Sequence, residues 1–127
     1  MMKTSINEFI KNNLKVKVLY EGEDSLMKHM MTSSRLPHIV CGDGFTMSVQ
    51  VGYSLYSKPK KVAKRYSEVE IGYPSEHEPL LEKYVESFYT EPDYTDSIYP
   101  YVPVKVVDKV LKKHGGIDLT ETLRKSV

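Results

Sequence analysis

The stretch that decides the fold runs from Phe45 to Leu55 and reads FTMSVQVGYSL. Apolar or aromatic residues alternate with small or polar ones, and a period of two is typical of a half-buried strand with one face on the core. We expect the core face to carry Phe45, Met47, Val49, Val51, Tyr53 and Leu55, and the polar face to carry Thr46, Ser48, Gln50 and Ser54.

Sequence on both sides of this run predicts further strands. The apolar segment 39–41 is a short strand, and the tight turn Gly42-Asp43-Gly44 joins it to the long run. A second alternating run, 69–73, places Val69, Ile71 and Tyr73 on one face. We expect the two alternating runs to pair as antiparallel neighbours through a loop over 57–65. Another short strand is expected over 16–20.

Three helices are predicted from capping signals and apolar stripes. Ser5 with Glu8 forms a capping box for a helix that ends near residue 13, and Ser75 with Glu78 forms another for a helix over 78–89. The third helix spans 103–114, with Gly115 as its left-handed cap. A short helix is expected over 25–31, an irregular loop over 91–100 and a frayed tail over 118–127. The chain, residues 1–127, therefore reads as a single α+β domain whose antiparallel sheet is covered on one face by the helices near 78–89 and 103–114.

Composition excludes several classes of protein. The chain has 127 residues with 18 Lys+Arg against 17 Asp+Glu, and this near-zero net charge argues against a general nucleic-acid coat. The single cysteine cannot form an intramolecular disulfide, which fits the cytoplasm. Because Met1-Met2-Lys3 leads into a polar stretch and no apolar run reaches about 18 residues, we expect neither a signal peptide nor contact with a membrane.

Candidate nucleophiles and metal ligands are weak. His38 and Cys41 lie three residues apart on a strand and so point to opposite faces, which prevents them from chelating one ion. Cys41 reads as a buried structural residue; as a nucleophile it would need His77, because His114 is better explained as a helix C-cap residue. We assign no catalytic residue, no metal ligand and no cofactor.

Acidic residues leave an enzymatic alternative open. The turn 42–44 could bind phosphate or present Asp43 to a divalent cation, although a plain hairpin turn is favoured. Glu68 and Glu70 share a strand face and could act as an acid-base pair, although such faces are usually just solvated. The alternative is a small enzyme acting on a phosphate-containing substrate, with Asp43, Glu68, Glu70 or His77 as its acid-base or metal-binding groups.

The expected loop carries a run of positive charge. Residues 58–65 read KPKKVAKR, which is five cations in eight residues, with Tyr56 and Tyr66 beside them as stacking surfaces. The candidate phosphate contacts are Lys58, Lys60, Lys61, Lys64 and Arg65. These residues support a second alternative, a nucleic-acid-associated accessory protein, against the plainer reading of a mobile solubilising loop.

Tyrosine is abundant, with ten tyrosines against three phenylalanines and no tryptophan. Tyrosine combines a large ring with a hydroxyl, a combination that is common at interfaces. Together with the polar strand face, this enrichment predicts a ligand or partner surface formed by Thr46, Ser48, Gln50, Tyr94, Tyr99 and Tyr101.

Five blocks of the sequence resemble a recurrent small protein of bacteriophages and prophages. These blocks are CGDGFTMSVQ (41–50), VEIGYPS (69–75), EP (78–79), IYPYVPV (98–104) and KHGGI (113–117). The resemblance covers about residues 36–117, leaves 1–35 and 118–127 outside, and implies a phage or mobile-element origin without catalytic residues to carry over. We therefore expect a non-enzymatic binding protein in the cytoplasm of a bacterial host. It would modulate a host process such as defence, as a homo-oligomer, through a host protein or a small anionic ligand such as a nucleotide.

Overall fold

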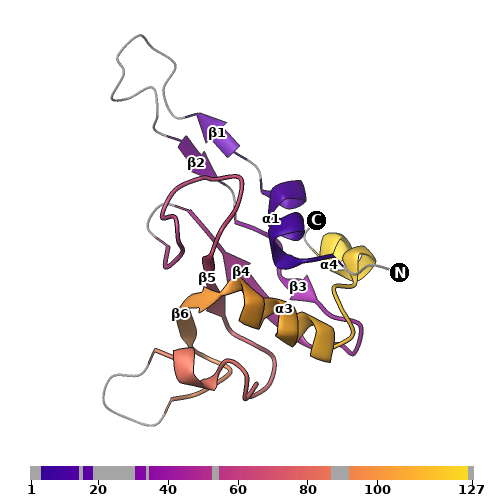
Figure 1. Ribbon diagram of the computed structural model, residues 1–127. Coiled ribbons are helices and arrows are strands. Elements are labelled where there is room, and N and C mark those ends of the chain that lie inside the picture. The colour runs from indigo at the N-terminus through magenta and orange to yellow at the C-terminus, as the bar shows by residue number, and fades with distance from the viewer. Residues whose placement is uncertain are drawn as a thin grey trace.

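The protein, seen in a computed structural model, is built on a four-stranded antiparallel sheet (Figure 1). The structure describes residues 4–14, 16–18, 31–33, 35–52, 55–86 and 92–125. The strand order is β3-β4-β5-β6, and the strands span β3 (Ile39–Val40), β4 (Thr46–Gln50), β5 (Glu68–Gly72) and β6 (Ile98–Pro103). With its helices, the chain has the α+β fold that the sequence predicts.

The central pair of strands follows the alternating sequence pattern. β4 and β5 are antiparallel, with Val49 opposite Ile71, as the two alternating runs predict. β4 is shorter than the run 45–55, because Gly52 adopts a φ of 120° and the chain then turns through Leu55, whose N–H donates to the Gly52 carbonyl. The expected positions of Tyr53 and Ser54 lie outside the described residues.

Both faces of β4 are buried, which the alternation did not predict. Met47 and Val49 are fully buried on one face, but Ser48 and Gln50 on the other face are each only 4% exposed. The Gln50 amide exchanges two hydrogen bonds with the backbone of Leu36, at 2.9 and 3.0 Å. The expectation that Ser48 lies off the core is therefore wrong, because the chain at Leu36 covers this face.

β6 lies where the sequence predicted an irregular loop over 91–100. The strand contains Pro100 and Pro103, which lack the N–H that a central strand needs. At the edge of the sheet this loss is tolerated, so the expectation is wrong for 98–100. The pairing of β6 with β5 shifts between Val69 and Ile71, which marks a β-bulge around Tyr101.

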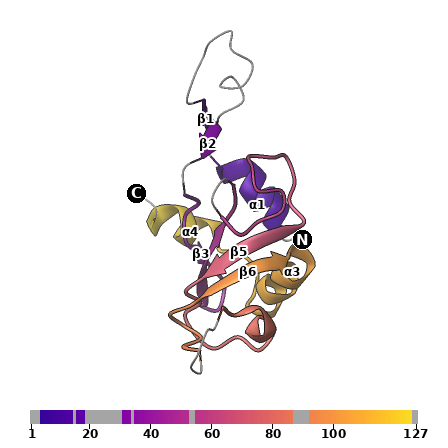
Figure 2. The ribbon, with the colours of Figure 1, turned by 90° about the vertical axis from the view of Figure 1, so that its left-hand side faces the viewer.

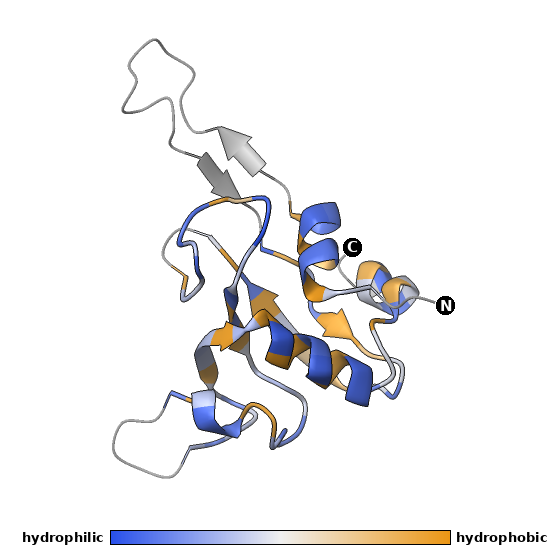
Figure 3. Ribbon diagram, in the orientation of Figure 1, coloured by the Kyte–Doolittle hydropathy of each residue, from blue (hydrophilic) through white to orange (hydrophobic). Residues whose placement is uncertain are grey.

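Two of the expected helices are confirmed, with small changes at their ends. α1 (Ile6–Asn13) begins at Ser5, whose Oγ accepts the Glu8 N–H at 3.2 Å. α3 (Val104–Lys113) buries Val107, Val110 and Leu111, and Figure 3 shows its apolar residues interrupting a hydrophilic ribbon. The Ile6 N–H donates to Asp108 of α3 at 2.8 Å, which ties the two helices together.

The third expected helix, over 78–89, is wrong within the described residues. The backbone bonds from Glu78 to Val85 all join residues three apart, and only η1 (Glu82–Tyr84) forms a 3-10 turn. Ser75 does not cap a helix; its Oγ accepts the Thr46 N–H at 2.9 Å instead. The side chain of Glu78 turns inward, and its Oε2 accepts the Leu80 N–H, which stops a regular first turn. Residues 87–89 lie outside the described part.

The C-terminal segment is more regular than expected. α4 (Leu119–Lys125) packs beside β3, where Thr122 Oγ1 accepts the Val40 N–H at 2.9 Å. The Asp118 N–H donates to the Val40 carbonyl at 2.7 Å, so this segment covers the free edge of β3. The expected frayed tail is therefore a helix over these residues.

A second, two-stranded sheet lies on the α1 side of the molecule, apart from the main sheet (Figures 1 and 2). β1 (Val16–Val18) pairs antiparallel with β2 (Met31–Ser33), so the strand expected over 16–20 is confirmed for its first three residues. The short helix expected over 25–31 falls mostly outside the described residues, and Met31 belongs to β2. None of the helices described is long and apolar enough to cross a membrane.

Candidate functional site

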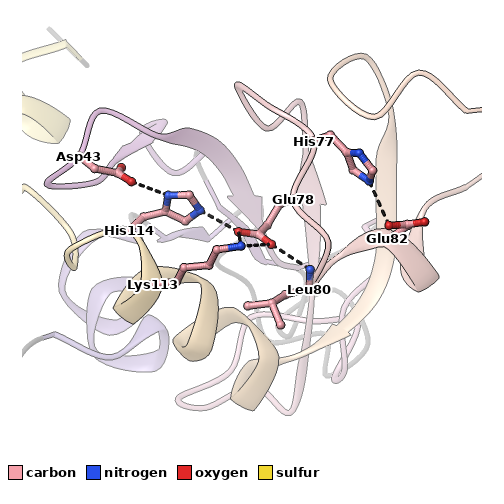
Figure 4. Close-up of polar contacts among 7 residues, drawn as sticks. All are labelled: Asp43, His77, Glu78, Leu80, Glu82, Lys113 and His114. Atoms are coloured by element: carbon pink, nitrogen blue, oxygen red, sulfur yellow. Dashed lines mark hydrogen bonds and ion pairs between the residues drawn. The ribbon is translucent and has the colours of Figure 1, made fainter.

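Four charged side chains meet where the turn that joins β3 and β4 contacts the end of α3 (Figure 4). We call Asp43, Glu78, Lys113 and His114 the charged network. His114 Nδ1 lies 2.7 Å from Asp43 Oδ2, and His114 Nε2 lies 2.7 Å from Glu78 Oε1. Lys113 Nζ lies 2.9 Å from the same Glu78 oxygen. The His114 and Glu78 side chains are 5% and 1% exposed, whereas the Asp43 and Lys113 side chains are each about half exposed, so a buried His114–Glu78 pair is flanked by two partly solvated charges.

Close backbone packing brings the network together. The turn 42–44 lies against the end of α3, where the Asp43 N–H donates to the His114 carbonyl at 3.0 Å. A Cβ on Gly42 would meet the Gly115 carbonyl oxygen at 3.1 Å, and Gly115 itself has a φ of 93°. Both positions therefore favour glycine. The ring of Phe45 stacks on His114 with centroids 4.0 Å apart, which fixes the plane of the imidazole.

The network holds His114 in its charged form. Burial works against the charge, but the hydrogen bonds to Glu78 and Asp43 outweigh it and raise the pKa of His114. Burial likewise opposes ionisation of Glu78, yet bonds from the Leu80 N–H, Lys113 and His114 lower its pKa. The pKa of Asp43 is lowered chiefly by the Phe45 N–H and then by His114.

Such an arrangement stabilises the fold better than it performs chemistry. A carboxylate can only accept, so each ring nitrogen of His114 donates, and neither keeps a lone pair for a proton or a metal ion. The C-cap role expected for His114 is confirmed, because the α3 helix ends there. Its two carboxylate partners were missed, since they lie 71 and 36 residues away in the sequence.

The other catalytic candidates are separated from one another. Burial and the nearby Asp43 raise the pKa of the Cys41 thiol to about 11, and this residue is buried. His77 stacks on Tyr94 at 3.8 Å and pairs with Glu82 at 3.1 Å, away from any thiol contact. Glu68 pairs with Lys58 at 3.3 Å. His77 and Glu68 thus each have a partner of their own, and none of the described contacts joins either of them to the Cys41 thiol.

The loop 58–65 is built into the fold, in contrast to the mobile loop that the plainer reading expects. Tyr66 is 3% exposed, and its hydroxyl donates to the Lys61 carbonyl and accepts the Ala63 N–H, both at 2.9 Å. The Asn7 side chain of α1 exchanges hydrogen bonds with the Tyr66 backbone at 2.9 and 3.0 Å. Tyr66 is therefore an anchor of the loop and offers no free ring for stacking.

A different tyrosine joins Tyr56 on the outer side of this loop. The rings of Tyr56 and Tyr101 lie 5.6 Å apart, and Lys60 Nζ lies 5.5 and 5.6 Å from their centroids. Lys58 Nζ lies 5.8 Å from the Tyr101 centroid. We call Tyr56, Lys58, Lys60 and Tyr101 the basic-aromatic surface; it contains three of the predicted site residues.

The other side of the loop forms a groove against α1 with a volume of about 710 Å³. Three cations line it, Lys11, Lys64 and Arg65, and each is exposed. Among the described residues, no ion pair uses any of these three side chains. The remaining lining residues are Ser5, Asn7, Glu8, Ile10, Leu14, Val62 and Ala63.

The ligand surface expected on the polar strand face does not form. Ser48, Gln50 and Tyr99 are buried, and Tyr99 donates its hydroxyl to the Tyr94 carbonyl inside the fold. Thr46 is half-buried and its N–H is used by Ser75, while Tyr94 is stacked on His77. Of the six residues predicted for ligand binding, Tyr101 is the one that lies in the basic-aromatic surface. Lys61 is exposed on the same loop, outside both contact sets.

Comparison of the chain with protein-family models, with curated proteins and with solved structures finds no match. Among the residues that the structure describes, no three His, Cys, Asp or Glu side chains are placed to hold one metal ion. The groove and the basic-aromatic surface are the described features that combine accessible positive charge with apolar or aromatic surface.

Proposed function

We propose that the protein is a non-enzymatic binding protein that takes a small anionic ligand, of the nucleotide class, in the groove between α1 and residues 62–65. The observation that carries this proposal is a groove of about 710 Å³ along which lie three cations that form no ion pair with the described part of the chain. Pockets for small molecules typically measure about 300–1,000 Å³, so the groove has the volume of a ligand site.

The chemistry of the lining matches a ligand that is part ring and part phosphate. Ile10, Leu14, Val62 and Ala63 provide apolar surface, and Ala63 and Leu14 pack against the core of the domain. The three cations can contact phosphate oxygens, while Glu8 is the one carboxylate in the lining. This balance favours an anion over a cation, and the apolar wall favours an anion with a flat ring over inorganic phosphate.

Binding without turnover fits the way in which the charged side chains are used. The charged network has no free lone pair on its histidine, and Cys41 keeps its proton at neutral pH because its pKa is about 11. A general base needs a proton acceptor within reach of the ligand. Among the described lining residues, Glu8 is the one carboxylate, and neither a histidine nor a cysteine lies beside it.

The biological role we propose combines this binding with the resemblance to phage and prophage proteins. A small phage protein that holds a nucleotide can remove a signal from the host, so the proposed role is modulation of a host process such as defence. The proposal also includes direct binding of a host protein and assembly into a homo-oligomer. These two parts are independent of the groove.

Two experiments test the proposal. The first is native mass spectrometry of the protein purified from a bacterial host. The second is thermal unfolding of the protein in the presence of a panel of nucleoside phosphates and cyclic dinucleotides. A ligand that binds only the folded state raises the free energy of unfolding by about 2.7 kcal/mol at a concentration of 100 times its Kd. We expect at least one member of the panel to bind, and to be recovered chemically unchanged.

Matched charge changes locate the site. Lys64→Gln with Arg65→Gln removes two groove cations and should abolish the thermal shift, whereas Lys112→Gln, an exposed cation on α3 outside the groove, should not. No binding by any member of the panel, or equal binding by the groove variant, contradicts the proposal. Conversion of a bound nucleotide to a product supports the enzyme alternative instead.

A further inference from the structure

We infer that the basic-aromatic surface, formed by Tyr56, Lys58, Lys60 and Tyr101, is a binding site for single-stranded nucleic acid. It shares no residue with the described lining of the groove, and the inference does not rest on the function proposed for the groove. Aromatic rings on which bases stack, beside cations that follow the phosphates, are the two parts from which single-strand sites are built.

The position of Tyr101 is the first observation. Around the β-bulge in β6, Tyr99 and Val102 are buried while Tyr101 is half-buried, and bulges commonly re-aim a side chain beside a functional site. Tyr101 has a φ of 54°, which is uncommon for any residue with a side chain other than asparagine or aspartate. Its N–H donates to the Tyr56 carbonyl at 3.1 Å, which locks the two tyrosines beside each other.

The exposure of the rings is the second observation. Tyr56 is 38% exposed and is among the few large hydrophobic side chains on the surface of the described residues. The two rings are tilted by 58°, so they present faces in different directions instead of stacking on each other. A tyrosine pair that served only the core would bury these faces.

The distribution of charge is the third observation. Lys58 is paired with Glu68, but among the described residues no carboxylate pairs with Lys60 or Lys61. Lys60 lies over both rings, and its long stem allows the ammonium to move to a phosphate when a base takes the ring face. The ammonium group of Lys60 therefore lies beside the two tyrosine rings, on a loop that the hydrogen bonds of Tyr66 anchor.

The ligand that this geometry selects is a single strand and not a duplex. Stacking on a tyrosine face requires an unpaired base, which a duplex does not offer at its surface. The near-zero net charge of the whole chain also means that it cannot hold a duplex by its overall field. Local contacts to a few nucleotides have to supply the affinity.

The test is fluorescence anisotropy with a labelled oligothymidine of about ten nucleotides, and with a duplex of the same length, in salt from about 50 to about 200 mM. We expect the single strand to bind and the duplex to bind more weakly. Tyr101→Gly removes the ring and suits the positive φ, so it should fold while weakening binding about 5- to 150-fold. Tyr101→Phe, which keeps the ring, should bind like the wild type.

Further variants separate this site from the groove and protect the test against misfolding. Tyr56→Leu changes an exposed ring, so it provides a second loss of stacking if Tyr101→Gly fails to fold. Lys60→Gln should lower the salt slope by about 0.7 for one lost phosphate contact on a single strand. Lys64→Gln with Arg65→Gln should leave single-strand binding largely intact. Failure of the wild type to bind at the lowest salt, preference for the duplex, or wild-type affinity in Tyr56→Leu would overturn the inference.

Discussion

Replacement of Glu78 by glutamine should destabilise the fold more than any surface substitution. The Glu78 side chain is 1% exposed and accepts hydrogen bonds from His114, Lys113 and the Leu80 N–H. Glutamine keeps the shape of the side chain but removes its charge, so the buried imidazolium of His114 retains Asp43 as its one carboxylate partner. Lys113 is half exposed and can turn to water.

The magnitude follows from these contacts. Breaking a buried ion pair by removal of one partner costs about 3–5 kcal/mol, and the remaining Asp43 contact places the expected loss near the lower end, at about 3 kcal/mol. A domain of this size has a total stability of about 5–15 kcal/mol, so the variant should stay folded but should unfold at a much lower urea concentration.

Urea unfolding followed by circular dichroism near pH 6 measures this loss. Glu76→Gln is the matched control, because Glu76 is exposed and has no charged partner among the described residues; it should change the stability by no more than about 0.5 kcal/mol. A loss below about 1 kcal/mol in Glu78→Gln, with the control unchanged, would refute the reasoning that this network is buried and mutually dependent.

Two further outcomes are expected. The pKa of His114 is raised in the folded state, so the stabilisation that its charge provides is complete below the ordinary pKa of 6.5 and is lost as the pH rises through the raised pKa. The difference in free energy of unfolding between the wild type and His114→Gln should therefore shrink towards alkaline pH. A difference that stays constant from about pH 5 to about pH 9 would contradict this. Ser48→Asp places a carboxylate in a position that is 4% exposed, so urea unfolding should show a loss in the free energy of unfolding of at least about 3 kcal/mol. Val49→Asp should cause a comparable loss. Unchanged stability in Ser48→Asp would show that this face of β4 is open to solvent.

The sequence predicts the elements that depend on local signals. The strand around Val49, the turn at Asp43 and the capping of α1 by Ser5 each involve residues a few positions apart, and each is confirmed. The glycine cap at Gly115 is also confirmed, since a left-handed conformation there follows from the local sequence.

The failures concern residues whose partners are distant. Glu78 looked like part of a capping box, but its carboxylate is used by His114, 36 residues later, and the helix over 78–89 is absent in the described residues as a result. Ser48 and Gln50 looked solvated, because nothing in β4 shows that the backbone at Leu36 lies over them. Tyr99 was expected in an irregular loop, because the prolines at 100 and 103 obscure an edge strand.

The way in which charge is distributed argues for binding as the work of this protein. Asp43, Glu78 and His114 pair with one another, and this stabilises the junction between the β3-β4 turn and the end of α3. On the loop 58–65, by contrast, most of the cations have no carboxylate partner in the described part of the chain, although the exposed Glu8 of α1 lines the same groove as Lys64 and Arg65. A loop anchored by the buried Tyr66 could have been closed by ion pairs at little cost to the fold. Cations of this loop that form no ion pair with the described residues are available to anions from outside, and the groove and the basic-aromatic surface each contain such cations.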